Sequence, residues 1–501
     1  MSTLNGNGNG LINWHGGLLA PKPELTPTQT NALISKTTDT QAVFQTAAGM
    51  ELRGQLLHIE RHALVFELYN PHTSPQVSET LNQFQVIFQR QIIYSGHAVA
   101  QSVLDAGTKL VCKVVLNEAS WLDSPPAEGV IAQAAWRNGF DKFTRGWQKS
   151  FVIMPEYKLL VTDLQVFFGD LRLWLDRVEA SINGASKAER SGLATQAAQE
   201  LRAPVLSALG NLFARFESIC NQIPAEQQAN HRAFGQRFLH PYMMCAPFTH
   251  RTFTKPLGYA GDYEMMNMIV RNGFEGRSLF AKLIHSFQVD QAPARAVRGR
   301  VNFLTAKIAG ETGRLALSGK PADIFCVACG PAWEATNFIA DHPLADQARF
   351  CLLDFNEETL QHTGQKVDEV RRKSGRRTPV RLVKNSVQNL LRAGARATRQ
   401  PAEYDLIYCS GLYDYLNDAT CKSLNTHLFD LLRPGGLLVV GNFAPTTPIQ
   451  NFMGHLLEWF LIYRDAKEIL ALAPEQVEPA ACTIRSEPSG TNFFLEVRKP
   501  E

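Results

Sequence analysis

One stretch, Asp323-Ile-Phe-Cys-Val-Ala-Cys-Gly-Pro-Ala-Trp-Glu334, changes from the pattern of a strand to that of a helix. It begins with a short apolar run that suits a buried strand. Gly330-Pro331 then breaks the run, and the small residues Ala328, Gly330 and Ala332 let a turn backbone approach a ligand closely. Strand, tight turn and helix open a nucleotide-binding α/β unit, although an ordinary strand-to-helix turn fits this stretch equally well by itself.

The segments that follow favour the nucleotide-binding interpretation. Four more apolar runs predict strands, with helical spacing between them, at residues 350–355, 381–386, 404–409 and 437–440. The first of these runs carries Asp354, about two dozen residues after Gly330, where an acid can accept hydrogen bonds from ribose hydroxyls. Arg433-Pro-Gly-Gly436 leads into the last run, and residues 483–485 and 492–497 predict a closing hairpin.

This order of turn, acid, strands and Pro-Gly-Gly turn resembles the class I S-adenosylmethionine-dependent methyltransferases over residues 300–500. The resemblance implies an α/β fold with a Rossmann-like, mostly parallel sheet whose last strand is antiparallel. It also implies S-adenosyl-L-methionine as the cofactor. This donor has no pyrophosphate, so alanines in the turn are easier to tolerate than they would be in a nicotinamide-binding domain.

The resemblance further implies the residues of a donor site. They are Ala328 and Gly330 at the methionine end with Pro331 fixing the turn, Asp354 at the ribose, Ser386 and Val387 beside the adenine, and Ser410 and Gly411 beside the transferring methyl group. Cys326 and Cys329 form a C-x-x-C that we expect within the first strand. Their odd spacing predicts opposite faces of that strand, so we interpret them as packing residues.

The composition is that of a soluble globular protein of two to four domains, with 501 residues, 45% hydrophobic and 19% charged. A net charge of +3 is too small to indicate a nucleic-acid partner. No apolar run reaches the ~20 residues of a membrane span, and no signal pattern opens the chain. The nine cysteines show no disulfide or zinc framework, so we expect no metal and a cytoplasmic location.

The N-terminal part of the chain falls into two regions. Residues 1–41 are rich in Asn, Gly, Thr and Pro and predict a disordered tail. Residues 42–125 alternate apolar and polar side chains between turn signals, which predicts a small β-barrel that resembles a PilZ domain. The arginine pair and the Asp/Asn-x-Ser-x-x-Gly motif of that family are absent, so a structural or interaction barrel is favoured over a cyclic di-GMP sensor.

Residues 126–240 predict helices, with a long one from Pro155 to Asn183. Packing on neighbouring helices is the plain interpretation, and a homodimer through this region is the alternative. Residues 241–300 predict a lid or substrate segment, in which Asp262 caps a helix beside Tyr259 and Tyr263. Residues 301–501 are then the methyltransferase domain.

The combination of these parts resembles the bacterial methyltransferase family that includes the 3-hydroxypalmitic acid methyl ester synthesis protein of quorum sensing. The resemblance implies esterification of a long-chain, 3-hydroxylated fatty acid. Residues 452–463 predict a very apolar helix that is either buried all round or lines an apolar pocket, which an acyl chain would occupy. Peripheral membrane contact is left open. We expect Tyr259, Tyr263 and Arg464 to bind the carboxylate, which needs no general base because it is ionised at neutral pH. Methylation of another small molecule or a protein, and a non-catalytic donor sensor, are the alternatives.

Overall fold

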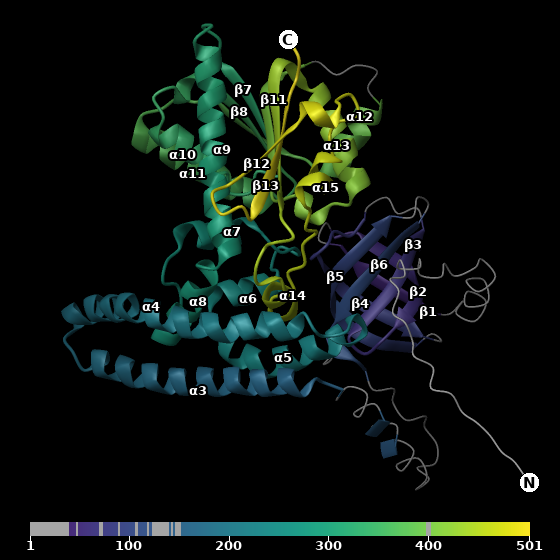
Figure 1. Cartoon of the computed structure of the whole chain (residues 1–501), viewed down its shortest axis with the longest axis vertical. Coiled ribbons are helices and arrows are strands. Elements are labelled where there is room, and N and C mark those ends of the chain that lie inside the picture. The colour runs from purple at the N-terminus through teal and green to yellow at the C-terminus, as the bar shows by residue number, and fades with distance from the viewer. Residues whose placement is uncertain are drawn as a thin grey trace, which may run out of the picture.

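The computed structural model describes residues 40–46, 49–69, 74–88, 91–105, 109–117, 120–122, 140–141, 144–145, 152–396 and 402–501. Along this part of the chain a β-barrel, a group of helices and an open sheet flanked by helices follow one another (Figure 1). The predicted fold class is confirmed. The predicted tail of residues 1–41 lies outside the described residues except at its very end, and the other domain boundaries stay predictions.

The N-terminal domain is a closed barrel of six antiparallel strands in the order β1-β2-β3-β6-β5-β4. The strands are β1 (Thr40–Gln45), β2 (Glu51–Ile59), β3 (Ala63–Tyr69), β4 (Thr80–Phe88), β5 (Gln91–Asp105) and β6 (Lys109–Leu116). Alternate residues point inward, so Phe44, Phe66 and Phe84 meet in the core, with ring centroids 5.2 to 5.9 Å apart. Closure leaves no edge strand for pairing with another chain. The predicted barrel is thus present, and its resemblance to PilZ domains stays a prediction.

A layer of helices connects the barrel to the sheet (Figure 1). Its members are α3 (Pro155–Asn183), α4 (Lys187–Cys220), α5 (Gln228–Met243), α6 (Pro247–Thr254), α7 (Tyr263–Arg271), α8 (Leu279–Val289) and α14 (Gln450–Leu456). Helices α3 and α4 form a long antiparallel hairpin, and α3 exposes Leu159, Val166 and Leu173 at intervals of seven residues. A dimer through this region stays a prediction. None of the helices in the described part of the chain is long and apolar enough to cross a membrane.

The C-terminal domain is a seven-stranded sheet in the order β12-β13-β11-β10-β7-β8-β9. Its strands are β7 (Ala322–Val327), β8 (Ala348–Asp354), β9 (Val380–Lys384), β10 (Tyr404–Ser410), β11 (Leu432–Phe443), β12 (Thr483–Ser486) and β13 (Asn492–Arg498). The first five sequential strands, β7 to β11, are parallel, and β13 runs antiparallel to β11. This strand order and the single reversed strand next to β11 give the sheet the topology of the class I methyltransferase fold.

Helices cover both faces of this sheet, so its strands are apolar on both sides. One face packs on α9 (Ala292–Ala316), α10 (Trp333–Asp341) and α11 (Glu357–Ser374). The other face packs on α12 (Val387–Arg396), α13 (Asp418–Asp430) and α15 (Ala466–Leu470). In an open parallel sheet of this kind, ligands bind beyond the carboxyl ends of the strands, where the strand order reverses. Here that position lies between β7 and β10.

Two local predictions are corrected by the structure. Strand β7 ends at Val327, so Cys329 lies in the turn after the strand, and both cysteines of the C-x-x-C are buried in the same apolar cluster. The predicted apolar helix of residues 452–463 is wrong, because α14 ends at Leu456 and the chain continues without helical structure to Tyr463. Glu458 adopts a left-handed φ of 48°, which breaks the helical path.

Tertiary hydrogen bonds replace the helical ones in this irregular segment. The amide of Phe460 donates to Ser78 Oγ of the barrel at 2.7 Å, and the amide of Ile462 donates to the Asp414 carbonyl at 2.7 Å. The segment ends at Arg464, which is 2% exposed. Its guanidinium donates to the carbonyls of Tyr413 and Leu416, to Asn442 Oδ1 and to the Asp418 carboxylate at 2.6 to 2.9 Å.

The buried bonds of Arg464 predict a large loss of stability for Arg464→Ala. Two carbonyls and an amide oxygen would lose their donor, at about 1–3 kcal/mol for each buried group left unsatisfied. Asp418→Ala is the matched control, since the Asp418 side chain is 78% exposed and its ion pair contributes ~1 kcal/mol at most. We expect the thermal unfolding midpoint to fall by several degrees for Arg464→Ala and by far less for the control. Equal shifts would contradict this account of Arg464.

Candidate active site

The turn after β7 has a backbone that repeatedly enters the left-handed region, and its residues line a cavity. Ala328, Gly330 and Ala332 have φ values of 54°, 51° and 49°, in the left-handed region. For an alanine this conformation costs about 1–2 kcal/mol, so other contacts must hold the turn. The amide of Cys329 donates to the Leu353 carbonyl at 2.9 Å, and the Gly330 carbonyl accepts from Thr363 Oγ1 at 2.7 Å. Strand β8 and helix α11 therefore fix the shape of the turn.

Asp354 at the end of β8 links this turn to the neighbouring strand. Its Oδ2 accepts from the amide of Gly330 at 3.1 Å, and its Oδ1 accepts from the amide of Asn356 at 3.0 Å. Burial raises the pKa of this carboxyl group above its usual value, while the amide bonds lower it. Each carboxylate oxygen can accept further hydrogen bonds. Asp354 is therefore both a structural tie and a candidate acceptor for ribose hydroxyls.

A cavity of about 630 Å³ extends from the turn across the carboxyl ends of β7, β8 and β10. This volume is within the ~300–1,000 Å³ range of small-molecule sites. The structure brings together in its lining all the predicted donor-site residues: Ala328, Gly330, Pro331, Asp354, Ser386, Val387, Ser410 and Gly411. Tyr259 and Tyr263 also line it, whereas Arg464 does not. All five N–H donors of Arg464 are directed to protein groups, so its predicted role as the carboxylate partner is corrected.

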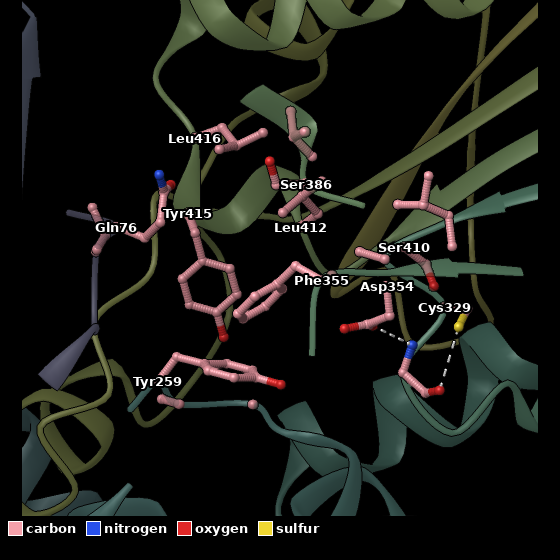
Figure 2. A pocket seen from close by; sticks show the side chains of 18 of the residues that line it. Gln76, Tyr259, Cys329, Asp354, Phe355, Ser386, Ser410, Leu412, Tyr415 and Leu416 are labelled. Atoms are coloured by element: carbon pink, nitrogen blue, oxygen red, sulfur yellow. Dashed lines mark hydrogen bonds between the residues drawn. The ribbon is translucent and has the colours of Figure 1, made fainter. Parts of the chain in front are cut away.

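The aromatic side chains of Tyr259, Phe355 and Tyr415 lie between the side of the cavity near Gln76 and the side near Asp354 (Figure 2). The ring of Tyr259 packs on Phe355, with centroids 5.0 Å apart. Tyr415 lies beside them, and its hydroxyl accepts from Trp459 Nε1 at 2.8 Å. Burial, followed by the nearby Asp354 carboxylate, raises the pKa of Tyr259, so this phenol stays protonated. Such rings can stack on a purine or contact a cationic group.

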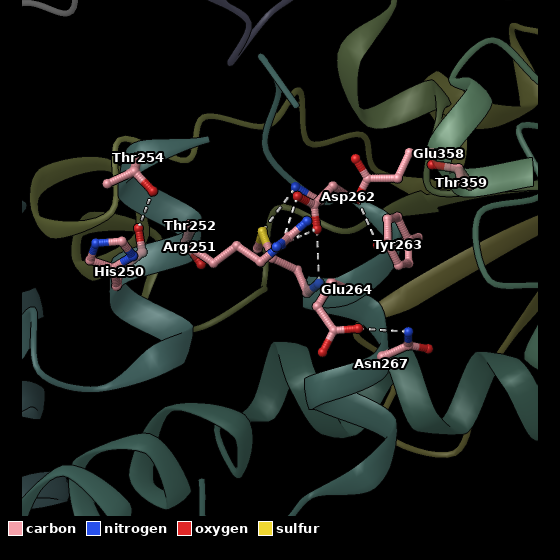
Figure 3. A network of polar contacts seen from close by, with 12 residues as sticks. His250, Arg251, Thr252, Thr254, Asp262, Tyr263, Glu264, Asn267, Glu358 and Thr359 are labelled. Carbon is pink, nitrogen blue, oxygen red and sulfur yellow. Dashed lines mark hydrogen bonds and ion pairs between the residues drawn. The ribbon is translucent and has the colours of Figure 1, made fainter. Parts of the chain in front are cut away.

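A polar network fixes the end of residues 255–263, which we call the lid segment, where it leads into α7 (Figure 3). Asp262 caps α7 by accepting from the amide of Met265 at 2.9 Å, as predicted from its position before the helix. Both of its carboxylate oxygens accept from Arg251 Nε at 2.9 Å. Tyr263 donates to Glu358 Oε1 at 2.8 Å, and burial followed by Glu358 raises its pKa to about 12. The hydroxyl of Tyr263 is therefore used in a hydrogen bond to α11, and the Tyr263 side chain also lines the cavity.

The sequence-based prediction missed Arg300 on α9, whose guanidinium lies against the end of β10. A Cβ atom added to Gly411 would lie 2.9 Å from Nη2 of Arg300, and this nitrogen contacts Met266 Sδ at 3.6 Å. Arg300 is only 8% exposed, and it forms no ion pair with any residue that the structure describes. The buried carboxyl groups of Glu334 and Asp414 interact with it electrostatically without reaching ion-pair distance. A buried cation without an ion pair is unfavourable, so this position suits a negatively charged ligand group.

Two acids near the turn give this part of the cavity a negative character, and one of them, Glu334, is close enough to Arg300 to interact with it electrostatically. Glu334 in the first turn of α10 is buried, accepts from the Tyr408 hydroxyl at 3.0 Å, and has a pKa raised by burial. With Asp354 it would repel a pyrophosphate, which normally binds at such a helix N-terminus. A cationic donor fits this end better. Over the residues that are described, the cavity lining contains neither histidine nor lysine, and no cluster of His, Cys, Asp or Glu could hold a metal ion.

The barrel also contributes to the cavity wall, through Gln76, Val77, Glu79 and neighbouring residues. No sequence signal indicated this contribution, because these residues lie more than two hundred positions before the turn. The run Ser410-Gly-Leu-Tyr-Asp-Tyr415, by contrast, follows a predicted strand. Residues after a parallel strand are placed at the ligand edge of the sheet, and this signal would have indicated Tyr415.

No protein-family model matches this chain, and no curated protein matches it. Among solved structures, it is similar to a possible exported protein from Bordetella parapertussis, with 17% identity, 50% of this chain and 86% of the other covered, and a TM-score of 0.39. Magnesium protoporphyrin IX methyltransferase from Synechocystis PCC 6803, solved with bound SAH, gives 15% identity, 46% and 93% coverage and a TM-score of 0.31. N-methyltransferase NodS from Bradyrhizobium japonicum WM9 gives 17% identity, 40% and 98% coverage and a TM-score of 0.26. These TM-scores are all below 0.5, so the fold assignment rests on the strand order of the sheet and not on these matches.

The position of Asp354 predicts a specific loss of donor binding in Asp354→Ala. Removing the carboxylate deletes acceptors for ribose hydroxyls and the tie to Gly330, so we expect S-adenosylhomocysteine to bind about tenfold or more weakly. Isothermal titration calorimetry measures this constant, and Asp368→Ala is the matched control because that side chain is 79% exposed on α11. An unchanged dissociation constant in a folded Asp354→Ala variant would refute the donor site.

Proposed function

We propose that this protein is an S-adenosylmethionine-dependent O-methyltransferase that esterifies the carboxylate of a long-chain, 3-hydroxylated fatty acid. The observation that carries this proposal is Arg300, which is buried beside Gly411, forms no ion pair among the described residues, and lies in the same cavity as Gly330 and Asp354. A carboxylate bound to Arg300 would lie next to the position expected for the methyl group. The sequence resemblance to enzymes that make fatty acid methyl esters supports the same acceptor.

The cavity residues fit a sulfonium donor. Asp354 would hold the ribose, and the open backbone at Gly330, where no atom lies within 4 Å of an added Cβ, leaves room for the methionine end. Glu334 and Asp354 disfavour a phosphate-bearing cofactor at this turn and favour a positively charged one. When bound, S-adenosylmethionine supplies a methyl group that is already activated by the positive sulfur.

The reaction then needs positioning more than proton transfer. A carboxylate oxygen forms a bond to the methyl carbon, the carbon–sulfur bond breaks with its electron pair on sulfur, and the products are the methyl ester and S-adenosylhomocysteine. No proton is released, because the carboxylate is ionised at neutral pH. A lining with no histidine or lysine among the described residues agrees with such a reaction.

Arg300 has a further electrostatic role in this proposal. Its positive charge and that of a sulfonium repel each other in a cavity of low dielectric. An acceptor carboxylate between them would remove this repulsion and pair with the guanidinium. Binding of the acceptor would thereby favour the geometry in which its oxygen faces the methyl group. Tyr259, which packs on Phe355 next to Asp354, would help to position the donor.

The acyl chain would bind along apolar walls. The apolar lining residues away from the turn include Val77, Val103, Leu110, Met266, Val270, Val297, Val301, Leu412, Leu416 and Ile462. Burial of a chain on such a surface contributes about 0.8 kcal/mol per methylene. Residues 452–463, which were expected to form this wall as a helix, contribute only Ile462.

The acceptor proposal predicts methyl ester formation that improves with chain length. Labelled methyl groups should pass from S-adenosylmethionine into the ester of 3-hydroxylated acids, and kcat/KM should rise about two- to fourfold per methylene until the cavity is filled. Tyr259→Phe retains the stacking ring and should reduce turnover only moderately, whereas Tyr259→Ala should reduce it strongly. Equal turnover of short and long acids would refute the acyl site. If no acid yields an ester while the donor binds, the acceptor assignment is wrong.

The role of Arg300 can be separated from donor binding with Arg300→Met. We expect the KM of the acid to rise tenfold or more, because a charge-assisted pair of roughly 1.5–3 kcal/mol is lost, while S-adenosylhomocysteine binds as before. The control is Arg295→Met on the same helix, where the side chain is 57% exposed. If Arg300 instead holds the amino-acid carboxylate of the donor, the variant will lose affinity for S-adenosylhomocysteine but not for methylthioadenosine, which lacks that carboxylate. That result would remove Arg300 from the acceptor site.

A further inference from the structure

The end of the connection between β3 and β4 that leads into β4, residues 77–79, is buried, although connecting segments normally run over a protein surface. Val77, Ser78, Glu79 and Thr80 are each at most 6% exposed. Ser78 adopts a left-handed φ of 65°, a conformation that is unfavourable for a serine and must be held by its surroundings. A buried segment of this kind must also satisfy its backbone polar groups. Its hydrogen-bond partners therefore determine which parts of the chain it is attached to.

Several of these hydrogen bonds cross from the barrel to the rest of the chain. Ser78 Oγ accepts from the amide of Phe460 at 2.7 Å and donates to the Phe460 carbonyl at 3.2 Å. The amide of Thr80 donates to the Gly258 carbonyl at 2.5 Å, and Glu79 and Tyr259 form an antiparallel bridge. The barrel is thus bonded directly to the irregular segment before Arg464 and to the lid segment.

A third connection reaches the side of the cavity formed by α12. Gln388 Nε2 donates to Ser74 Oγ at 3.0 Å. The segment Ser74–Glu79 therefore reaches from α12 to the lid segment and forms the wall of the cavity between them. Figure 2 shows Gln76 on the far side of the aromatic rings from Asp354 and Cys329. The barrel wall consequently faces the part of the cavity that lies away from the proposed ribose site.

We propose that the barrel is part of the active site, in which Ser74–Glu79 together with Val103 and Leu110 forms the wall that binds and selects the methyl acceptor. This inference rests on the proposed methyltransferase function and assigns a role to a domain that carries no recognisable ligand motif. Each of these barrel residues except Ser78 lines the same cavity as Arg300 and Gly411. The acceptor thus lies between two domains that are distant in sequence.

The chemistry of the wall indicates the class of acceptor. Val77, Val103 and Leu110 offer an apolar surface, which suits an aliphatic chain. Gln76 adds one amide side chain, whose Nε2 donates to the Ser74 carbonyl at 3.3 Å. Its Oε1 can still accept a hydrogen bond. A mainly apolar wall with a few polar groups, those of Ser74, Gln76 and Glu79, suits an aliphatic chain that carries one hydroxyl group close to its carboxylate.

The wall is tested with Val103→Trp in the full-length protein, with Leu104→Trp as the matched control. The two residues are adjacent on β5, but Val103 lines the cavity, whereas Leu104 is 65% exposed and does not. We expect Val103→Trp to raise the KM of the longest acids at least tenfold, to change that of short acids less than twofold, and to leave the dissociation constant of S-adenosylhomocysteine within twofold. Leu104→Trp should leave all three unchanged. Identical behaviour of the two variants, or a loss confined to donor binding, would overturn the inference.

Gln76→Ala tests the polar part of the wall. We expect the preference for a 3-hydroxylated acid over the matching unsubstituted acid to fall about fivefold, since one hydrogen bond is lost. Gln101→Ala on β5 is the control, because Gln101 does not line the cavity. An unchanged preference in Gln76→Ala would remove this residue from the acceptor wall.

Failure of the proposed function itself would give a different result. If the wild-type protein esterifies no acid, binding of 1-anilinonaphthalene-8-sulfonate, an apolar anion, still reports whether the barrel wall and Arg300 form one site. Reduced fluorescence with both Val103→Trp and Arg300→Met, and not with Leu104→Trp, would support the shared wall. Equal fluorescence in all variants would overturn the inference independently of the acceptor.

Discussion

The hydrogen bond from the Gly330 amide to the Asp354 carboxylate is the contact on which the cavity depends. It joins the turn after β7 to the end of β8. Together with the Cys329–Leu353 and Thr363–Gly330 bonds it holds three small residues in left-handed conformations that two alanines would otherwise avoid. The same carboxylate faces the cavity. One side chain thus stabilises the turn and lines the cavity, so a ligand bound there would encounter a site already shaped for it.

The features of the fold and the site that could be predicted from the sequence are those set by local sequence patterns. A strand, a tight turn and an acid at the end of the next strand are local patterns, and the topology of parallel sheets brings such strand ends to one edge. For this reason Gly330 and Asp354 could be assigned to one site from their pattern in the sequence. The methyltransferase resemblance added Ser386 and Gly411, and all four line the same cavity. The helix of residues 155–183 was predicted in the same way, from a proline at its start and a glycine after its end.

The parts that could not be predicted depend on contacts between distant segments. Residues 452–463 have the composition of an apolar helix, yet Ser78 and Asp414 compete successfully for the backbone amides of Phe460 and Ile462. Arg464 looked like a free cation because sequence does not reveal the carbonyls that surround it. Arg300 was missed because its neighbours in the sequence predict only a helix. Nothing in that pattern shows that its guanidinium would be buried at the cavity without an ion pair among the described residues.

The junction between barrel and sheet changes how the barrel should be understood. A regulatory domain on a flexible linker could be displaced without altering the catalytic cavity. Here the barrel donates from Thr80 to the lid, accepts from Phe460, and lines the cavity itself. A shift of the barrel by the length of one hydrogen bond would break these contacts and open the side of the cavity formed by Ser74–Glu79, while the Gly330–Asp354 tie would persist. In the proposed function, any ligand or partner that moves the barrel would therefore affect acceptor binding first and donor binding only afterwards.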